Sequence, residues 1–133
     1  DALPQTEAEK RQQITALAWR LMGVPYSWGG RTALGIDCSG LSELVYRMVG
    51  VKIPRDADMQ FAAGTEVREP FTAGDLLYFG SDKGHRSVSH VAISLGGWHI
   101  VHSSRSRNGV YVDDVQAVDH LKNTFLGTRS FLP

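Results

Sequence analysis

Cysteine is nearly absent from this chain. Cys38 is the only one among 133 residues, so no disulfide can form within the chain. A single cysteine fits a reducing cytosol and fits equally an envelope protein without disulfides. Net charge is absent too, since Lys+Arg and Asp+Glu both number 14. This balance argues against the broad basic surface typical of nucleic-acid-binding proteins, and we expect no nucleic acid as a partner.

Long hydrophobic runs are also missing. No apolar stretch approaches the roughly 20 residues that cross a bilayer, so we expect no membrane span. Residues 1–13 are polar and lack the apolar segment of a signal peptide. Hydrophobic residues still make up 42% of the chain, an ordinary globular fraction. The length suits one compact domain with one core, over residues 1–133.

The first half of the chain predicts two helices. Residues 6–9 have the pattern of a capping box, and the helix that follows should end before Pro25. A second helix should run over residues 38–50, where apolar side chains recur at helical spacing. Residues 26–36 and 51–74 are punctuated by glycine and proline and predict loops and mostly irregular structure. The first helix should bury one face: Ile14, Leu17, Ala18, Leu21 and Met22.

The second half predicts strands. Its short apolar segments cover residues 76–79, 88–95, 99–103, 110–112 and 125–132. Helices followed by an antiparallel meander are typical of an α+β fold, with N-terminal helices packed on one face of an antiparallel sheet of about five or six strands.

Cys38 should lie where the second helix begins. Backbone N–H groups have no intrahelical partner there, and the helix dipole is positive. Both effects favour the thiolate, which is the nucleophilic form of cysteine. A lone cysteine can instead be a buried, inert thiol, so the surroundings have to decide.

The strand pattern offers Cys38 two histidine partners. A two-residue turn between the central strands would place His90 and His102 on opposite faces of the sheet. A three-residue loop, residues 96–98, pairs Leu95 with His99 and makes the two histidines diagonal neighbours on one face, about 7–8 Å apart at Cα. We predict the second register, which makes a nucleophile–base–orienter triad available.

A zinc site is the competing interpretation. Cys38, His90 and His102 would supply three ligands, but the sequence has no CxxC or HxxxH element to support a metal. We therefore expect no metal and no cofactor.

The chain resembles the NlpC-type cell-wall cysteine peptidases, a papain-like family, over roughly residues 14–131. The resemblance is carried by segments that occur in the family's order: Pro25-Tyr26-Ser27-Trp28-Gly29-Gly30, Gly35-Ile36-Asp37-Cys38-Ser39-Gly40-Leu41, Ile53-Pro54-Arg55-Asp56, Ala73-Gly74-Asp75-Leu76, Ser89-His90-Val91-Ala92-Ile93 and His99-Ile100-Val101-His102-Ser103. Any single segment would be weak evidence, whereas the ordered set is specific.

The resemblance implies a Cys-His-His triad on a papain-like sheet-and-helix scaffold. Cys38 would be the nucleophile, His90 the general base and acid, and His102 the residue that orients His90. The oxyanion would accept hydrogen bonds from the Cys38 backbone N–H and the Tyr26 hydroxyl. Tyr26 can equally be a core ring bonded to backbone. Trp28 should pack against the protein.

The implied substrate is a murein stem peptide, cleaved between γ-D-glutamate and meso-diaminopimelate or L-Lys. The closest resemblance is to members that process short muropeptides, in which Asp56, after Arg55, would help hold the free N-terminal ammonium of L-alanine. Arg55 and Asp56 can instead form a solvated ion pair. Asp37 and Ser39 match substrate-contacting positions, and Asp37 can also cap the helix. The family often has serine or threonine where this chain has Ala57.

The same residues are compatible with other functions. An amidase or acyltransferase could use the same Cys-His-His scaffold, and a non-catalytic module could bind murein peptides without cleavage. Relatives of the recycling type carry N-terminal SH3-like domains, so residues 1–133 would be a single catalytic domain and could be a fragment lacking them. We expect a bacterial cell-envelope or extracytoplasmic location, with a cytoplasmic recycling role as the alternative.

Overall fold

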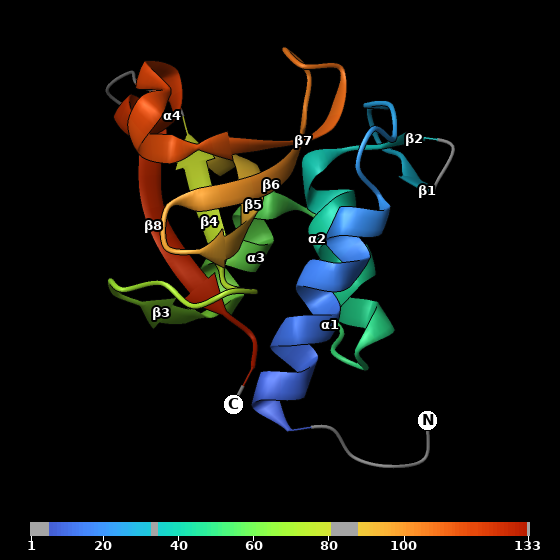
Figure 1. The fold of residues 1–133 in the computed structure, drawn as a ribbon, viewed down its shortest axis with the longest axis vertical. Coiled ribbons are helices and arrows are strands. Elements are labelled where there is room, and N and C mark those ends of the chain that lie inside the picture. Colours follow the sequence, from blue (N-terminus) through green and yellow to red (C-terminus); the bar gives the residue numbers. More distant parts are fainter. Residues whose placement is uncertain (1–5, 33–34, 81–87, 133) are drawn as a thin grey trace.

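Two helices, α1 (Glu7–Arg20) and α2 (Cys38–Met48), pack against each other and against one face of a six-stranded antiparallel sheet (Figure 1). The structure is a computed structural model that describes residues 6–32, 35–80 and 88–132. The α+β class, the N-terminal helices and the number of strands agree with the prediction. In the described part of the chain, no helix has the length and apolar character needed to cross a membrane.

The remaining elements are the strands and the shorter helices. In chain order they are β1 (Arg31–Thr32), β2 (Gly35–Ile36), α3 (Ala57–Ala63), β3 (Thr65–Val67), β4 (Leu76–Gly80), β5 (Val88–Gly96), β6 (His99–Ser104), β7 (Gly109–Asp114), the 3-10 helix η1 (Val115–Ala117), α4 (Asp119–Thr124) and β8 (Phe125–Ser130). The large sheet has the order β3-β8-β4-β5-β6-β7, and β1 pairs with β2 separately. Strands β4 to β7 form the predicted meander, and β8 returns to lie between β3 and β4.

The predicted irregular stretch 51–74 is wrong in part, because it contains α3 and β3. Helix α3 has only 7 residues and buries Gln60 completely. A helix this short, with a polar side chain in the core, gives little apolar periodicity to detect. Strand β3 is an edge strand with exposed side chains, so alternation is weak there as well.

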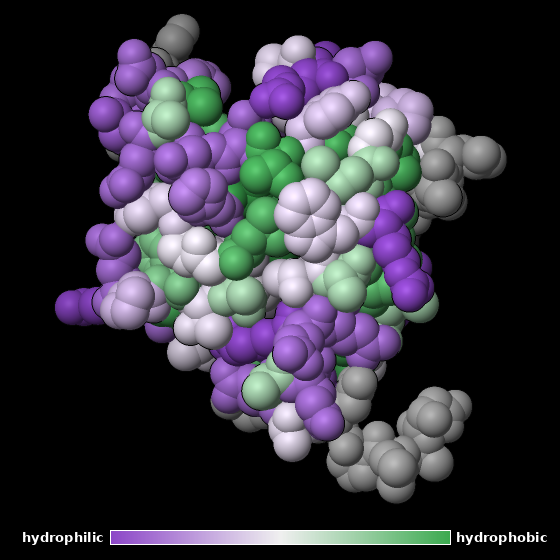
Figure 2. All heavy atoms as spheres, viewed as in Figure 1, coloured by the Kyte–Doolittle hydropathy of each residue, from purple (hydrophilic) through white to green (hydrophobic). Residues whose placement is uncertain are grey.

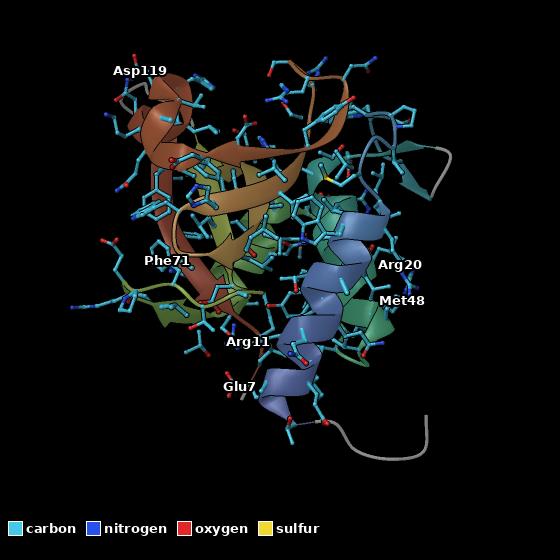
Figure 3. The ribbon with its side chains drawn as sticks, in the orientation of Figure 1. Glu7, Arg11, Arg20, Met48, Phe71 and Asp119 are labelled. Carbon is cyan, nitrogen blue, oxygen red and sulfur yellow. The ribbon has the colours of Figure 1, made fainter. Side chains whose placement is uncertain are left out.

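The sheet buries apolar side chains on both faces. One core lies under α1 and α2 and includes Ile14, Val45, Tyr78 and Ile93. A second core lies on the opposite face and includes Leu77, Phe79, Ala92, Ile100 and Leu121. Figure 3 shows Phe71, a member of this second core, on the side of the sheet away from α1. Because Leu121 belongs to α4, a short helix that the sequence did not predict covers part of the face opposite the N-terminal helices.

Helix α1 is held at its first two turns. The predicted capping box is present, since Thr6 Oγ1 accepts a hydrogen bond from the Glu9 N–H and the Glu9 carboxylate accepts one from the Thr6 N–H. Arg11, one turn after Glu7 (Figure 3), donates to Glu7 at 2.9 Å and to the buried Asp75 at 2.7 Å. The second bond ties α1 to the segment that leads into β4.

The β5–β6 hairpin places the two candidate histidines on one face. Ile93 pairs with Val101 and Ser94 with Ile100, which is the predicted register. The predicted Leu95–His99 pair is wrong, because a bulge at Leu95 makes Gly96 the partner of His99. Residues 97–98 form the turn, and Gly96 and Gly97 have φ values of 121° and 64°. Two glycines in this region of φ allow the bulge and the turn to follow each other directly.

Candidate active site

An open cleft with a volume of about 1280 Å³ lies between the start of α2, the turn joining β6 to β7, and α4. Its lining includes Cys38, His90 and His102, which come from a helix and two neighbouring strands. Figure 2 shows a notch in the upper edge of the molecule between α4 and the β6–β7 turn. The cleft is large enough for a peptide of a few residues.

Cys38 is the first residue of α2, as the sequence predicted. Asp37 caps the helix, with its Oδ1 accepting a hydrogen bond from the Gly40 N–H at 2.7 Å. On the sheet side, Ser103 Oγ donates to the Ile36 carbonyl at 2.6 Å, which fixes the entry to α2 beside β6. As a whole residue, Cys38 is partly buried.

The cysteine sulfur lies where β5 and β6 separate. In the described residues, pairing between these strands stops at Ile93 and Val101, although both strands continue toward the cleft. The Val91 N–H lies beyond this point and donates to the Cys38 sulfur. Since Val91 follows His90 in the chain, this contact holds the sulfur beside the candidate base.

Burial dominates the ionisation of the thiol. It raises the pKa of Cys38, against the lowering effect of the Val91, Ser39 and Cys38 backbone N–H groups. The helix start therefore acts in the predicted direction, but its effect is smaller than the cost of burying a charge.

Burial also disfavours the charged form of His90. Burial, with smaller contributions from the neighbouring His102 and His120, lowers the pKa of His90 to about 3. Its ring lies 5.7 Å from that of Phe79, in the second core. At pH values between the lowered pKa of His90 and the raised pKa of Cys38, the pair carries one proton. This proton lies either on sulfur, beside a neutral imidazole, or on the imidazole, beside a thiolate. Proton transfer from sulfur to His90 therefore needs no net uptake or loss of protons.

His102 joins His90 to a fourth group. His102 Nδ1 lies 2.7 Å from His90 Nε2, and His102 Nε2 lies 2.7 Å from Asp113 Oδ2. His102 is only 3% exposed, and burial lowers its pKa against the raising effect of Asp113. The other Asp113 oxygen accepts a hydrogen bond from Arg107 at 2.7 Å.

The sequence analysis missed Asp113. The signal was available in the strand alternation, because His102 pairs with Tyr111 across β6 and β7. Asp113 lies two residues farther along β7 and so on the same face, as a diagonal neighbour of His102. Ending that strand at Val112 in the prediction removed it from consideration.

Tyr26 lines the same cleft next to Cys38. Its pKa is raised by burial and by the negative charges of an ionised Cys38 and of Asp37. Among the described residues its hydroxyl has no hydrogen-bond partner, whereas the core alternative required one. The guanidinium of Arg105 lies 5.8 Å from the centre of the Tyr26 ring, on the cleft side.

Arg55 clamps the two residues that flank Cys38. It donates to Ser39 Oγ at 2.7 Å and to Asp37 Oδ2 at 3.0 Å. The Gly29 N–H also donates to Asp37 Oδ2, at 3.0 Å. Arg55 does not form the ion pair with Asp56 that the sequence left open, and its guanidinium is committed to the start of α2.

Asp56 and Trp28 remain available to a ligand. Asp56 is exposed, precedes α3 without making a side-chain cap, and lines the cleft. Trp28 also lines it and is 82% exposed, so the prediction that its indole packs is wrong. Ala57, where relatives often have a hydroxyl, is buried and belongs to the first core.

Two glycines bring the Tyr26–Trp28 segment close to the nucleophile. Gly40 lies in the first turn of α2, and a side chain there would overlap the Gly30 carbonyl. That carbonyl accepts a hydrogen bond from the Asp37 N–H at 3.0 Å. The close contact positions the loop that carries Tyr26 against the helix start.

Among the described residues, His, Cys, Asp and Glu side chains form no group of three or more arranged to hold a metal ion. The cleft chemistry that these residues offer is nucleophilic: a thiol, an adjacent imidazole and hydrogen-bond donors.

Comparison with known proteins identifies the family. Residues 23–129 match the NlpC/P60 family. The chain is 35% identical over 113 residues to the gamma-D-glutamyl-L-lysine dipeptidyl-peptidase of Bacillus cereus, which covers 84% of this chain and 34% of that protein. The chain thus spans about a third of the length of this curated relative.

Solved structures agree with the sequence match. An NlpC/P60 family protein from Bacillus cereus superposes with a TM-score of 0.89 at 30% identity, over 100% of this chain and 42% of that chain. The NlpC/p60 domain of the peptidoglycan hydrolase SagA superposes with a TM-score of 0.76 at 36% identity, over 91% of this chain and 98% of that one. The chain therefore belongs to the NlpC/P60 family of cell-wall peptidases.

Proposed function

We propose that this chain is a cysteine endopeptidase domain that hydrolyses the γ-D-glutamyl–diamino acid bond of murein stem peptides, with meso-diaminopimelate or L-Lys after the cleaved bond. The observation that carries the proposal is the 2.7 Å contact between His90 Nε2 and His102 Nδ1 in the cleft that Cys38 lines. A nucleophile, a base and an orienting group in one cleft are what acyl transfer requires.

The first half of the reaction forms a thioester. The Cys38 sulfur attacks the γ-carbonyl carbon of D-glutamate while His90 takes the thiol proton. The carbonyl oxygen becomes an oxyanion, for which the Cys38 backbone N–H and the Tyr26 hydroxyl are the available donors. His90 then gives its proton to the leaving amine of the diamino acid, and the C–N bond breaks.

The second half releases the acid. A water molecule attacks the thioester carbon as His90 accepts one of its protons, and His90 returns that proton to the Cys38 sulfur. The products are the shortened γ-D-glutamyl peptide and the free diamino acid end. His102 contacts His90 throughout and keeps its ring in place.

Asp56 is the proposed ligand for a free N-terminal ammonium on the substrate. Its carboxylate is exposed in the cleft that Trp28 also lines, and the Bacillus cereus relative carries the name of a dipeptidyl-peptidase. Asp37 and Ser39 remain proposed substrate contacts in the cleft lining. We assign Arg55 a different role from the predicted substrate contact, that of fixing these two side chains. Relatives named as peptidoglycan hydrolases favour a place in the cell envelope.

The test is hydrolysis of L-Ala-γ-D-Glu-L-Lys and of its meso-diaminopimelate counterpart, followed by mass spectrometry. We expect L-Ala-γ-D-Glu and the free diamino acid, with no product from the Cys38→Ala variant. Intact peptide that stays bound to the wild-type protein would instead identify a binding module. Transfer of the γ-glutamyl group to an added amine in preference to water would identify an acyltransferase.

A further inference from the structure

Four side chains form one hydrogen-bonded chain that leads away from the nucleophile. His90 Nε2 contacts His102 Nδ1, His102 Nε2 contacts Asp113 Oδ2, and Asp113 Oδ1 accepts from Arg107, each at 2.7 Å. The β5–β6 register and the β6–β7 pairing place three of them, His90, His102 and Asp113, on the same face of the sheet. The triad proposed above uses only the first contact, so Asp113 and Arg107 are unexplained by it.

We propose that Asp113 sets the direction of the two hydrogen bonds that involve the His102 and His90 rings, and thereby leaves Nδ1 of His90 as the free base for Cys38. Asp113 is thus a positioning residue. Arg107 holds the other oxygen of its carboxylate and so fixes the orientation of the Asp113 side chain. The proposal rests on the proposed function only in assigning His90 as the base.

The direction follows from which atoms can donate. An ionised carboxylate only accepts hydrogen bonds, so His102 Nε2 must carry the proton in its contact with Asp113. A neutral imidazole has one N–H, so His102 Nδ1 is then an acceptor. His90 Nε2 must therefore donate to it. His90 has its single proton on Nε2, and its Nδ1 keeps the lone pair.

A neutral His102 is necessary for this result. An imidazolium at position 102 would donate from both nitrogens, and His90 would have to carry its proton on Nδ1, where no base would remain. Burial favours the neutral form of His102 by lowering its pKa. The charged and titratable groups that face the two rings are Cys38 from α2, His120 from α4, and Asp113 and Arg107 from β7 and the turn before it.

Arg107 gives the proposal a distinctive consequence. A guanidinium can only donate, so in an Asp113→Asn variant it should hold the amide oxygen, as it now holds Asp113 Oδ1. The amide nitrogen, a donor, would then face His102 Nε2. The two hydrogen bonds that involve the imidazole rings would reverse, and His90 would present an N–H to Cys38. Removing Arg107 as well would free the amide to turn over and restore the original direction.

The experiment compares four variants of the full chain by iodoacetamide alkylation of Cys38 at neutral pH, a readout that needs no peptide substrate. Asp113→Asn should slow alkylation by at least about 10²-fold, with about 10⁴-fold, the loss of kcat caused by a wrong tautomer in a related triad, as the upper bound. Arg107→Ala should change it by only a few fold. The double variant Asp113→Asn/Arg107→Ala should react at least tenfold faster than Asp113→Asn. Asp114→Asn is the matched control, because Asp114 lies next in the chain and its own contacts, with the exposed His99 at 3.8 Å and with the Gln116 N–H at 3.0 Å, involve none of the four side chains.

Imidazole nitrogen NMR in the Cys38→Ala background tests the same point directly. We expect His90 and His102 both to carry the proton on Nε2, and His90 to move it to Nδ1 when Asp113→Asn is added. A double variant that reacts no faster than Asp113→Asn, or a His90 protonated on Nδ1 with Asp113 intact, would overturn the proposal even if Asp113→Asn were poorly folded. Failure to cleave any muropeptide, with these alkylation and NMR results obtained, would instead refute the proposed function alone.

Discussion

Replacing Arg55 by methionine separates a structural role for this residue from a role in binding substrate. Methionine keeps an unbranched side chain but removes both hydrogen bonds, to Ser39 Oγ and to Asp37 Oδ2. The Asp37 side chain, only 12% exposed, then loses its cation. Hydrogen bonds to charged groups contribute about 1.5–3 kcal/mol each, and removing one partner of a buried ion pair costs about 3–5 kcal/mol.

We expect Arg55→Met to cost less than the roughly 3–5 kcal/mol that removing one partner of a buried ion pair costs. The Arg55 side chain is 23% exposed, so water screens part of the interaction. Asp37 also keeps the N–H groups of Gly29 and Gly40 as donors. We therefore expect a loss of about 2–3 kcal/mol in the free energy of unfolding, or a drop of about 10 °C in Tm for a domain of this size.

Thermal and urea unfolding followed by circular dichroism measure this loss. The matched control is Arg68→Met, since Arg68 is exposed and lies outside the cleft; its effect should stay within about 0.5 kcal/mol. An Arg55→Met variant with wild-type stability and a raised KM for muropeptides would refute the structural role of Arg55. It would return Arg55 to the substrate-binding role that the sequence suggested.

Three further predictions concern the cleft. Tyr26→Phe should lower kcat by about 10²-fold through loss of an oxyanion donor, with an unchanged unfolding midpoint; a kcat within a few fold of wild type would exclude the hydroxyl. Asp56→Asn should raise KM about fivefold for peptides with a free N-terminal amine and leave the N-acetylated peptides unchanged, as judged by steady-state cleavage of both series. Stability should fall as pH drops from about 6.5 toward 3, because unfolded His90 binds a proton that the folded site excludes. Urea titrations across this range should show a slope of up to about 1.4 kcal/mol per pH unit for this one group, and a shallower slope in His90→Gln; equal slopes would show that His90 titrates normally.

Local sequence signals were sufficient for the parts of the site that depend on one element. Asp37 was a candidate cap of α2 on the sequence, and it caps that helix. The Cys38 position at the first residue of that helix followed from apolar spacing alone. The helix signal did not reveal how deeply the thiol is buried, since burial depends on where β5 and β6 separate around it.

Signals from more than one element were harder to use. The common face of His90 and His102 could be inferred because strand alternation has a period of two residues and only two registers were sensible. The bulge at Leu95 could not, since it changes the turn without changing the faces. Trp28 was misplaced because a large aromatic residue usually packs, whereas here the loop that carries it is held by backbone contacts of Gly30 and Gly40.

The position of Asp113 explains why the base in this site is specified so far from the nucleophile. Cys38 and Asp37 are set by the local geometry of α2, but the tautomer of His90 depends on β6, through His102, and on β7, through Asp113. Each strand therefore contributes one step of the hydrogen-bonded chain, and a one-residue shift in the β6–β7 pairing would turn Asp113 to the opposite face. The pairing of these two strands is in this sense part of the active site, because it decides which nitrogen of His90 can accept the proton of Cys38.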